Sequence, residues 1–309
     1  MLHEIRYTIP VSELDLKTAK DYAIMHFAEH MKFEGFGSLT SSQMVFQKGS
    51  QFGGEISANV SLTAVHFKLT FLEELYSEAK IFMKEFMDNS IINFKHFEAV
   101  KEILIEEIKG DRKSIRLTDS MVHKNFVGLY SFPDGGRRKT LLEITQQDIV
   151  DFFEKMAKAK TYFISSLEPE KSAKSLVDLC MPKPIMKKKE FDGYVEFERG
   201  GYYLFAMNAE EWCIYEDFFA FEKLIQDKFN CEYEIFLLVL PGMVIIKRFI
   251  QHDVDFLDCC DYMEEVEKNP KVMKKHDEYA LLRYQGLRLD PAFRNEEMWD
   301  QAVFNAKSI

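Results

Sequence analysis

The stretch AIMHFAEHMKFEG, Ala23 to Gly35, places two histidines and a glutamate among bulky apolar residues. In a helix with about 3.6 residues per turn, His26 and His30 lie one turn apart on the same face, and Glu29 lies beside them. Two imidazoles on one helical face are a common way to hold a divalent metal ion. The stretch therefore predicts a helix that carries part of a metal site.

The pattern H-x-x-E-H is more informative than its single histidines. The chain has 8 histidines, and a lone histidine on an apolar helix face is usually packed or hydrogen-bonded in the core. The whole pattern would arise by chance on the order of 0.02 times in a chain of this composition. A catalytic zinc site needs three protein ligands and an open position for water, so the pattern predicts a third ligand elsewhere.

The composition indicates a globular protein with a sizeable core. The chain has 309 residues, 47% of them hydrophobic, which is enough for one large or two medium domains without disulfides. The net charge of −11 argues against a nucleic-acid partner and permits a basic or extended peptide. The five cysteines are odd in number and lack C-x-x-C spacing, which favours reduced thiols in the cytoplasm: Cys180, Cys213, Cys231, Cys259 and Cys260.

Neither a signal peptide nor a membrane span is expected. The first residues lack a basic region followed by an apolar run, and the apolar stretch at 235–246 is too short and too interrupted to span a bilayer. The sequence therefore favours a cytoplasmic protein.

Strand-like and helical patterns alternate along the first half of the chain. The periodicity predicts strands at 5–11, 41–49, 161–167 and, as two extended runs, 53–71. It predicts helices at 14–33, 72–89, 93–114 and 145–159, the last beginning with Thr145 and Asp148 at capping-box spacing. This mixture predicts the α+β class.

The second half repeats this order in a shorter form. Strands are expected at 194–198, 202–207, 232–240 and 244–250, with a helix at 214–229 and further helices at the end. Two prolines and a run of lysines mark a boundary near 181–189. We therefore predict two related mixed α/β sandwich domains, each a sheet covered by helices, at 1–183 and 189–309.

HFAEHMKFEG closely resembles the inverted zinc motif of the insulinase and pitrilysin family, which includes the mitochondrial processing peptidases. In that family the third ligand is a glutamate in an apolar stretch, V-I-L-x-E-I, with 76 residues between it and the second histidine. EILIEEI places Glu107 at this spacing from His30. The resemblance implies one Zn²⁺ per chain, held by His26, His30 and Glu107, with Glu29 as general base.

Other polar residues near Glu107 are weaker candidates for the third ligand. Glu106 points roughly 100° away around the helix and is expected to be solvated. His96 and Glu102 are alternative ligands, although Glu102, at i−5 from Glu107, lies on a different helical face. In this resemblance, Val100 occupies the place of a glutamate that supports the ligands.

Two further segments carry the resemblance beyond the metal site. GGEISANVSL at 53–62 is similar to the family's edge strand that pairs with substrate, G-x-x-N-A-x-T, with Ser57 in the place of asparagine and Ala58 in that of alanine. Together with Asn59, they are expected to bind a peptide as an added β-strand. LIQDKFNCEYEIF resembles L-R-x-x-x-G-L-x-Y-S-V, so Tyr233 matches the transition-state tyrosine, whereas Gln226 replaces its arginine partner.

The resemblance implies a zinc endopeptidase that forms one half of a closed chamber. A related subunit in a heterodimer, or a second copy in a homodimer, would supply the other half. Removal of a leader peptide from a ribosomally made peptide is a possible task by analogy. The alternative is a non-catalytic peptide-binding or structural homologue, which Gln226 and the short second domain favour and the intact metal motif opposes.

Overall fold

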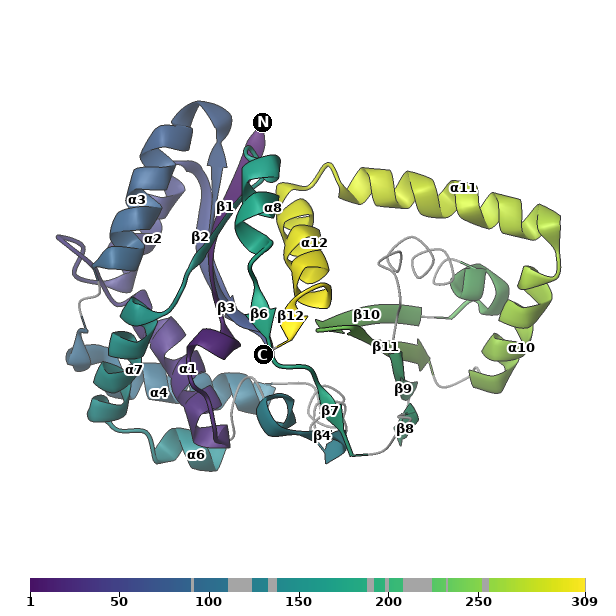
Figure 1. Cartoon of the computed structure of the whole chain (residues 1–309), viewed down its shortest axis with the longest axis horizontal. Coiled ribbons are helices and arrows are strands. Elements are labelled where there is room, and N and C mark those ends of the chain that lie inside the picture. Colours follow the sequence, from purple (N-terminus) through teal and green to yellow (C-terminus); the bar gives the residue numbers. More distant parts are fainter. Residues whose placement is uncertain are drawn as a thin grey trace.

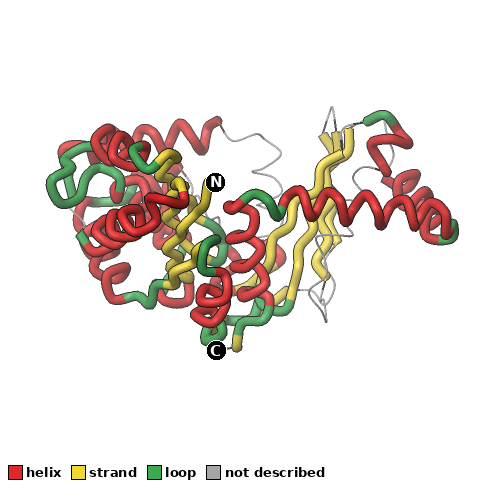
Figure 2. The backbone as a smooth tube through the Cα atoms, turned by 90° about the horizontal axis from the view of Figure 1, so that it is seen from above, coloured by secondary structure: helices red, strands yellow, loops and turns green. Residues whose placement is uncertain are grey.

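A computed structural model of the chain describes residues 1–89, 92–110, 124–132, 138–187, 192–197, 200–207, 224–231, 233–251 and 256–308. The described chain contains two four-stranded antiparallel sheets with helices packed around them (Figure 1). The tube view separates the strands of the two sheets (Figure 2). The predicted mixture of sheet and helix is confirmed.

The first sheet has the order β2-β3-β1-β5, so that β2 is an edge strand. Its strands are β1 (Leu2–Pro10), β2 (Gly53–Val60), β3 (Ala64–Leu72) and β5 (Tyr162–Ser165). A tight turn joins β2 to β3, where the Ser61 amide donates to the carbonyl oxygen of Ala64 at 2.8 Å. This turn fixes the register of the hairpin, which decides the face on which each β2 side chain lies.

Helices pack on both faces of this sheet. On one face, Phe67 of β3 contacts Phe33 and Phe86, and on the other His66 contacts Trp299. The helices of the first part are α1 (Ala19–Lys32), α2 (Ser42–Ser50), α3 (Tyr76–Asp88), α4 (Phe97–Gly110), α6 (Arg138–Leu142), α7 (Gln146–Lys158) and α8 (Pro169–Leu176). Short 3-10 turns are Val11–Glu13, Glu73–Leu75, Phe94–His96 and Gly128–Ser131.

The second sheet has the order β10-β11-β9-β8. Its strands are β8 (Asp192–Phe197), β9 (Gly200–Met207), β10 (Tyr233–Leu240) and β11 (Met243–Gln251). Three helices follow: α10 (Phe256–Glu267), α11 (Pro270–Leu287) and α12 (Pro291–Phe304). Two-residue strands complete the fold, β4 (Phe126–Val127) with β7 (Ile185–Met186) and β6 (Cys180–Met181) with β12 (Lys307–Ser308).

One predicted strand is wrong. Residues 41–49 were expected to be extended, but they form α2 (Ser42–Ser50). Ser41 caps this helix by accepting the Met44 amide at 3.4 Å, and Val45 and Gly49 are buried at helical spacing. The predicted capping box of α7 is confirmed at Thr145 and Asp148. Of the helix expected at 214–229, residues 224–229 are helical and the rest lie outside the described residues.

A buried polar network attaches α12 to the first sheet. Arg6 of β1, only 1% exposed, donates to Glu4 Oε1 at 3.0 and 3.1 Å and to Glu296 Oε2 at 2.6 Å. Asn295 Nδ2 donates to the Glu4 side chain at 3.0 Å. Because each charged group in this network has a partner, α12 can cover the sheet without leaving a buried charge unpaired.

The domain boundary near 181–189 stays a prediction. The position of α12 shows how the two parts of the chain are connected, because this helix follows the second sheet in sequence but packs against β1 of the first. It also contacts β10, and the Gly242 amide donates to the carbonyl oxygen of Phe304 at 2.9 Å. Within the described residues, no helix has the length and apolar character needed to cross a membrane.

The buried His66 predicts a pH-dependent stability. Burial, with a smaller contribution from Arg6, lowers its pKa from 6.5 to about 3, so below pH 6.5 the unfolded chain binds a proton that the folded chain does not. The free energy of unfolding should therefore fall as the pH drops from 6.5 toward 4.5, with His66 contributing up to about 1.4 kcal/mol per pH unit.

Urea unfolding of the His66→Gln variant across this pH range measures the contribution, because glutamine does not titrate there. The variant should show a shallower dependence on pH than the unaltered protein. His96→Gln is the control, since the side chain of His96 is 43% exposed. Equal slopes for His66→Gln and the unaltered protein would contradict the assignment.

Candidate metal centre

Helix α1 holds the three residues of the H-x-x-E-H motif in a fixed frame. A capping box fixes its start, where the Thr18 amide donates to Asp21 Oδ2 at 2.8 Å and the Asp21 amide donates to Thr18 Oγ1 at 3.2 Å. Tyr22 donates to the carbonyl oxygen of Leu129 at 2.8 Å. Lys20 bonds both carboxylate oxygens of Asp148 on α7 at 2.9 Å. These contacts, together with its buried apolar residues, set the rotation of α1.

Helix α4 brings Glu107 to the histidines. Its residues Phe97, Val100 and Leu104 are buried at spacings of three and four, and Glu107 follows at the next position of the same stripe. The ring of Phe97 packs on Phe27 of α1 with centroids 4.8 Å apart. The apolar contact between the two helices therefore aims the Glu107 carboxylate at α1.

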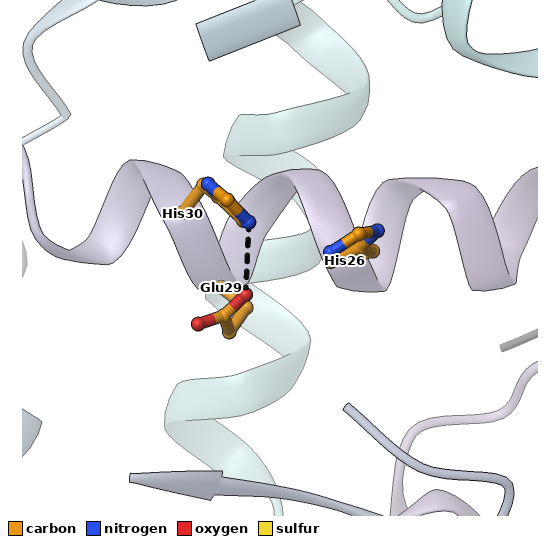
Figure 3. A group of neighbouring side chains, drawn as sticks. All are labelled: His26, Glu29 and His30. Carbon is orange, nitrogen blue, oxygen red and sulfur yellow. Dashed lines mark ion pairs between the residues drawn. The ribbon is translucent and has the colours of Figure 1, made fainter. Parts of the chain in front are cut away.

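The side chains of α1 and α4 converge on one point. Oε2 of Glu107 lies 3.6 Å from His26 Nε2 and 3.5 Å from His30 Nε2. Glu29 lies beside His30, with Oε2 at 3.5 Å from the same Nε2 atom (Figure 3). A ligand atom of His26, one of Glu29 and one of His30 all lie within 4.8 Å of one another.

These distances fit a tetrahedral zinc site. Metal bonds of about 2.0–2.1 Å at tetrahedral angles separate two ligand atoms by roughly 3.3 Å. The distances of 3.5 and 3.6 Å from Glu107 to the imidazoles are close to that value. Two imidazoles and one carboxylate are also a donor set that zinc accepts, with one position left for water. The residues present therefore fit the ion.

Burial has opposite effects on the charges of Glu29 and His30. Burial, with a smaller contribution from the nearby Glu107 carboxylate, raises the pKa of Glu29 to about 8. Burial lowers the pKa of His30 to about 4, which keeps the imidazole neutral, as a metal ligand must be. A divalent cation at this point would act against the effect of Glu107 on Glu29.

The convergent side chains open into a cavity of about 1130 Å³. Its walls come from α1, α2, β2 and α4, and they combine apolar with acidic side chains. Edge strand β2 borders it from Gly54 to Val60. Within the described residues, no strand pairs with the outer edge of β2. The cavity is large enough for several residues of a peptide.

The three predicted substrate residues line this cavity from different faces of β2. Ala58 pairs with Phe67, whose ring faces α1, so the Ala58 side chain lies on the face of the metal centre. Asn59 pairs with His66, which contacts α12, and Ser57 shares this opposite face by strand alternation. Ser57 and Asn59 therefore border the cavity mainly as part of the edge.

The structure does not place the two site residues predicted from the second part, Gln226 and Tyr233, at the cavity. Gln226 is half-buried in the helical segment 224–229 and is not among the described residues that line the cavity. Tyr233 begins β10 and pairs with Ile250, while its side chain lies outside what the structure describes. Their roles stay predictions.

The other candidates near Glu107 take separate positions. Val100 is buried and lines the cavity, whereas Glu102 and Glu106 are exposed. His96 Nδ1 lies 3.3 Å from Glu34 Oε2. In the described contacts, Glu107 lies against both histidines of the motif. The predicted alternatives, His96 and Glu102, do not.

Sequence reasoning missed Glu34 and Phe46, which also line the cavity. Glu34 follows His30 by four residues, so the spacing that joined His26 to His30 could have indicated it. Phe46 was missed because its segment was predicted to be a strand. Helix α2 instead packs beside β2 and contributes this ring to the wall.

No model of a known protein family matches the chain. Solved structures do resemble it: a protease from Helicobacter pylori has a TM-score of 0.72 at 15% identity, covering 99% of this chain and 84% of that one. An M16-like peptidase from Alicyclobacillus acidocaldarius has a TM-score of 0.64 at 11% identity, covering 99% and 83%. A peptidase M16 inactive domain from Pseudomonas fluorescens has 0.63 at 12%, covering 98% and 83%. The chain therefore has the fold of M16-like peptidases.

Proposed function

We propose that the protein is a zinc-dependent endopeptidase whose ligands are His26, His30 and Glu107. The observation that carries the proposal is the approach of Glu107 Oε2 to 3.5–3.6 Å from both Nε2 atoms, next to the buried carboxylate of Glu29. The free edge of β2 along the same cavity supports a peptide substrate. The resemblance of the fold to M16-like peptidases agrees with this chemistry.

Glu29 is the proposed general base. When bound, Zn²⁺ polarises a carbonyl group and lowers the pKa of a water molecule toward about 7. The Glu29 carboxylate, 6% exposed and in contact with His30, can accept a proton from the attacking water. It can then donate this proton to the leaving amine, which completes hydrolysis of the peptide bond.

The substrate would bind by β-strand addition to β2. Because the Ser61 amide bonds to Ala64, the hydrogen-bonded pairs alternate so that Asn59 and Ser57 bond inward to β3. The backbone groups of Ala58 and Val60 then face the free edge, where an extended peptide could pair with them. Addition of a strand places the peptide backbone along the metal cavity.

The remaining parts of the proposal concern assembly and biological role. Tyr233 would donate a hydrogen bond to the developing oxyanion, and Gln226 would bind the same region more weakly than arginine. We therefore propose that the chain acts as one half of a dimer, with a related subunit or a second copy as the other half. The odd, unspaced cysteines support a cytoplasmic location, and leader-peptide removal is the proposed task.

A non-catalytic peptide-binding protein is the second candidate. Gln226 in the position of the family's arginine favours it, and one structure of similar fold is a peptidase M16 inactive domain. In such a protein, the β2 edge would still bind a peptide, but the metal centre would not catalyse hydrolysis. Metal content and hydrolysis distinguish the two candidates.

The first prediction from this site concerns metal content. The purified protein should contain about one zinc ion per chain, and Glu107→Gln should lose most of it because amide oxygen is a poor zinc ligand. Glu106→Gln, the same change at the exposed neighbouring residue, is the control and should retain zinc. Mass spectrometry measures the zinc content of each protein. Unchanged zinc content in Glu107→Gln would refute the ligand assignment.

The second prediction separates the base from the ligands. Glu29→Gln should retain zinc, while hydrolysis of a fluorogenic peptide library falls by roughly 10²-fold or more, the usual contribution of a positioned base. Zinc content and turnover are measured on the same preparation. Near-normal turnover would show that another residue activates the water.

The third prediction concerns assembly. Replacement of a charged by a neutral hydrogen-bond donor weakens oxyanion binding, so the isolated chain should cleave peptides slowly, and a co-encoded related subunit should raise the rate by at least about tenfold. Light scattering at the assay concentration reports the oligomeric state. Robust cleavage by a chain that is monomeric under these conditions would contradict the two-half arrangement.

A further inference from the structure

A partly buried lysine of the first sheet lies outside the metal cavity and takes no part in the proposed mechanism. Lys68 of β3 is not among the described residues that line the cavity. Among the residues that the structure describes, none forms a hydrogen bond with its ammonium group, and no carboxylate oxygen lies within 4.0 Å of it. A partly buried cation without a direct counter-charge can bind an anionic ligand.

The two acidic groups that stabilise the charge of Lys68 are both bound to another cation. Arg6 donates to Glu4 Oε1 at 3.0 and 3.1 Å and to Glu296 Oε2 at 2.6 Å. Burial, and to a smaller extent the positive charge of Arg6, lowers the pKa of Lys68, whereas Glu296 and Glu4 act in the opposite direction. The ammonium form is therefore destabilised overall, and a further carboxylate beside it would offset this effect.

The register of the sheet places Lys68 one strand away from the edge that borders the cavity. Lys68 pairs with Ser57 of β2 on one side and with Arg6 of β1 on the other, so these three side chains share one face of the sheet. This is the face on which His66 contacts α12, opposite the metal centre. Ser57 and Lys68 are both partly exposed, so solvent reaches this end of the face.

A peptide that pairs with β2 would bring one of its side chains next to this row. The added residue opposite Ser57 would lie on the same face as Lys68, two strand spacings or roughly 9.5 Å from it. The four-carbon stem of lysine and the side chain of a glutamate can together span this distance across the small side chain of Ser57. The Ser57 hydroxyl can donate a second hydrogen bond to the same carboxylate.

The two faces of the added strand would meet different charges. Toward the metal centre, the described cavity wall includes the carboxylates of Glu29, Glu34 and Glu107 and no lysine or arginine. On the far face, the register places the ammonium-bearing Lys68 beside the edge residue Ser57. Because successive side chains of a strand alternate between the faces, an acidic residue is favoured by Lys68 only at positions that lie on the far face.

We propose that the protein favours peptides with an acidic side chain on the far face of the added strand, where Lys68 binds the carboxylate and Ser57 contributes a hydrogen bond. This inference rests on the proposed function, because it takes the peptide to pair with β2. Lys68 is then a specificity residue that binds a side chain of the peptide at a distance from the bond that is cut.

Peptide binding tests the proposal without relying on cleavage. The full-length Glu29→Gln protein is loaded with zinc and titrated with labelled peptides that have blocked ends and a single glutamate, which is moved along an otherwise uncharged sequence. Each peptide has a partner with glutamine at the same position. At one position or more, glutamate should bind about fivefold more tightly than glutamine, as expected for a charge-assisted bond that solvent still reaches. Where binding is too weak to measure, the ratio of kcat/KM for the two peptides on the unaltered protein gives the same comparison.

Three further variants, made in the Glu29→Gln background, locate the interaction. Lys68→Met should reduce the preference for glutamate to less than about twofold, whereas Lys68→Arg, which keeps the charge, should retain most of it. Lys48→Met is the matched control, because Lys48 is an exposed lysine of α2 that is not among the described residues of the cavity wall. Urea unfolding confirms that each variant is folded. The comparison of glutamate with glutamine leaves Lys68 unaltered, so it holds however Lys68→Met behaves.

The outcomes separate this proposal from the proposed function. Equal binding of glutamate and glutamine at every position would overturn the role of Lys68 and leave the peptidase proposal intact. A preference that persists in Lys68→Met would place the carboxylate elsewhere, for example on the zinc ion, with the same consequence. Loss of the preference in Lys48→Met as well would show general charge attraction and also overturn it. If no peptide binds and the unaltered protein cleaves none, both proposals fail.

Discussion

The packing of α4 on α1 is the contact on which the candidate site depends. Phe97 against Phe27 and the buried Val100 and Leu104 set the rotation of α4, and this rotation carries Glu107 to the imidazoles. A turn of the helix by one residue would move this carboxylate about 100° away. Apolar contacts that contribute nothing to the chemistry thus determine whether the polar groups meet.

The same contact creates an electrostatic problem that a cation solves. Glu29 is nearly fully buried beside His30, and Glu107 adds a second carboxylate to the same small volume. Burial, and to a smaller extent repulsion from the Glu107 carboxylate, raises the pKa of Glu29 to about 8. A divalent cation would pair with both charges, so the geometry and the electrostatics support the same ligand.

Much of the first part could be predicted from sequence because its signals are local. The period of the helix containing His26, the capping box at Thr145 and the alternation in 53–71 each have a physical cause within a few residues. Residues 41–49 were misread because a short segment with Val45 and Phe46 fits a strand as well as a helix. The structure shows that Ser41 caps a helix here, because its side chain accepts a hydrogen bond from the Met44 amide.

Other features depend on distant contacts and could not be predicted from local patterns. Attachment of α12 to β1 through Arg6 and Glu296 joins residues 290 positions apart, and no local spacing indicates it. Glu107 could be predicted as the third ligand only because its spacing from His30 resembles that of a family, whereas the α4 stripe alone leaves other carboxylates open. The contact of the buried Glu34 with His96, 3.3 Å between Oε2 and Nδ1, also required the tertiary structure, since no local spacing joins these two residues.

The two sheets differ in what they contribute to the site. In the described part of the chain, no strand pairs with the edge of the first sheet that borders the cavity, and the far face of this sheet is covered by α12, which also contacts β10 of the second sheet. The candidate metal residues and the described cavity wall all come from residues before 110, so the described second part does not line the cavity. In the proposed dimer, a second peptidase-like half facing β2 would add a wall to this cavity while leaving the strand edge available to the substrate.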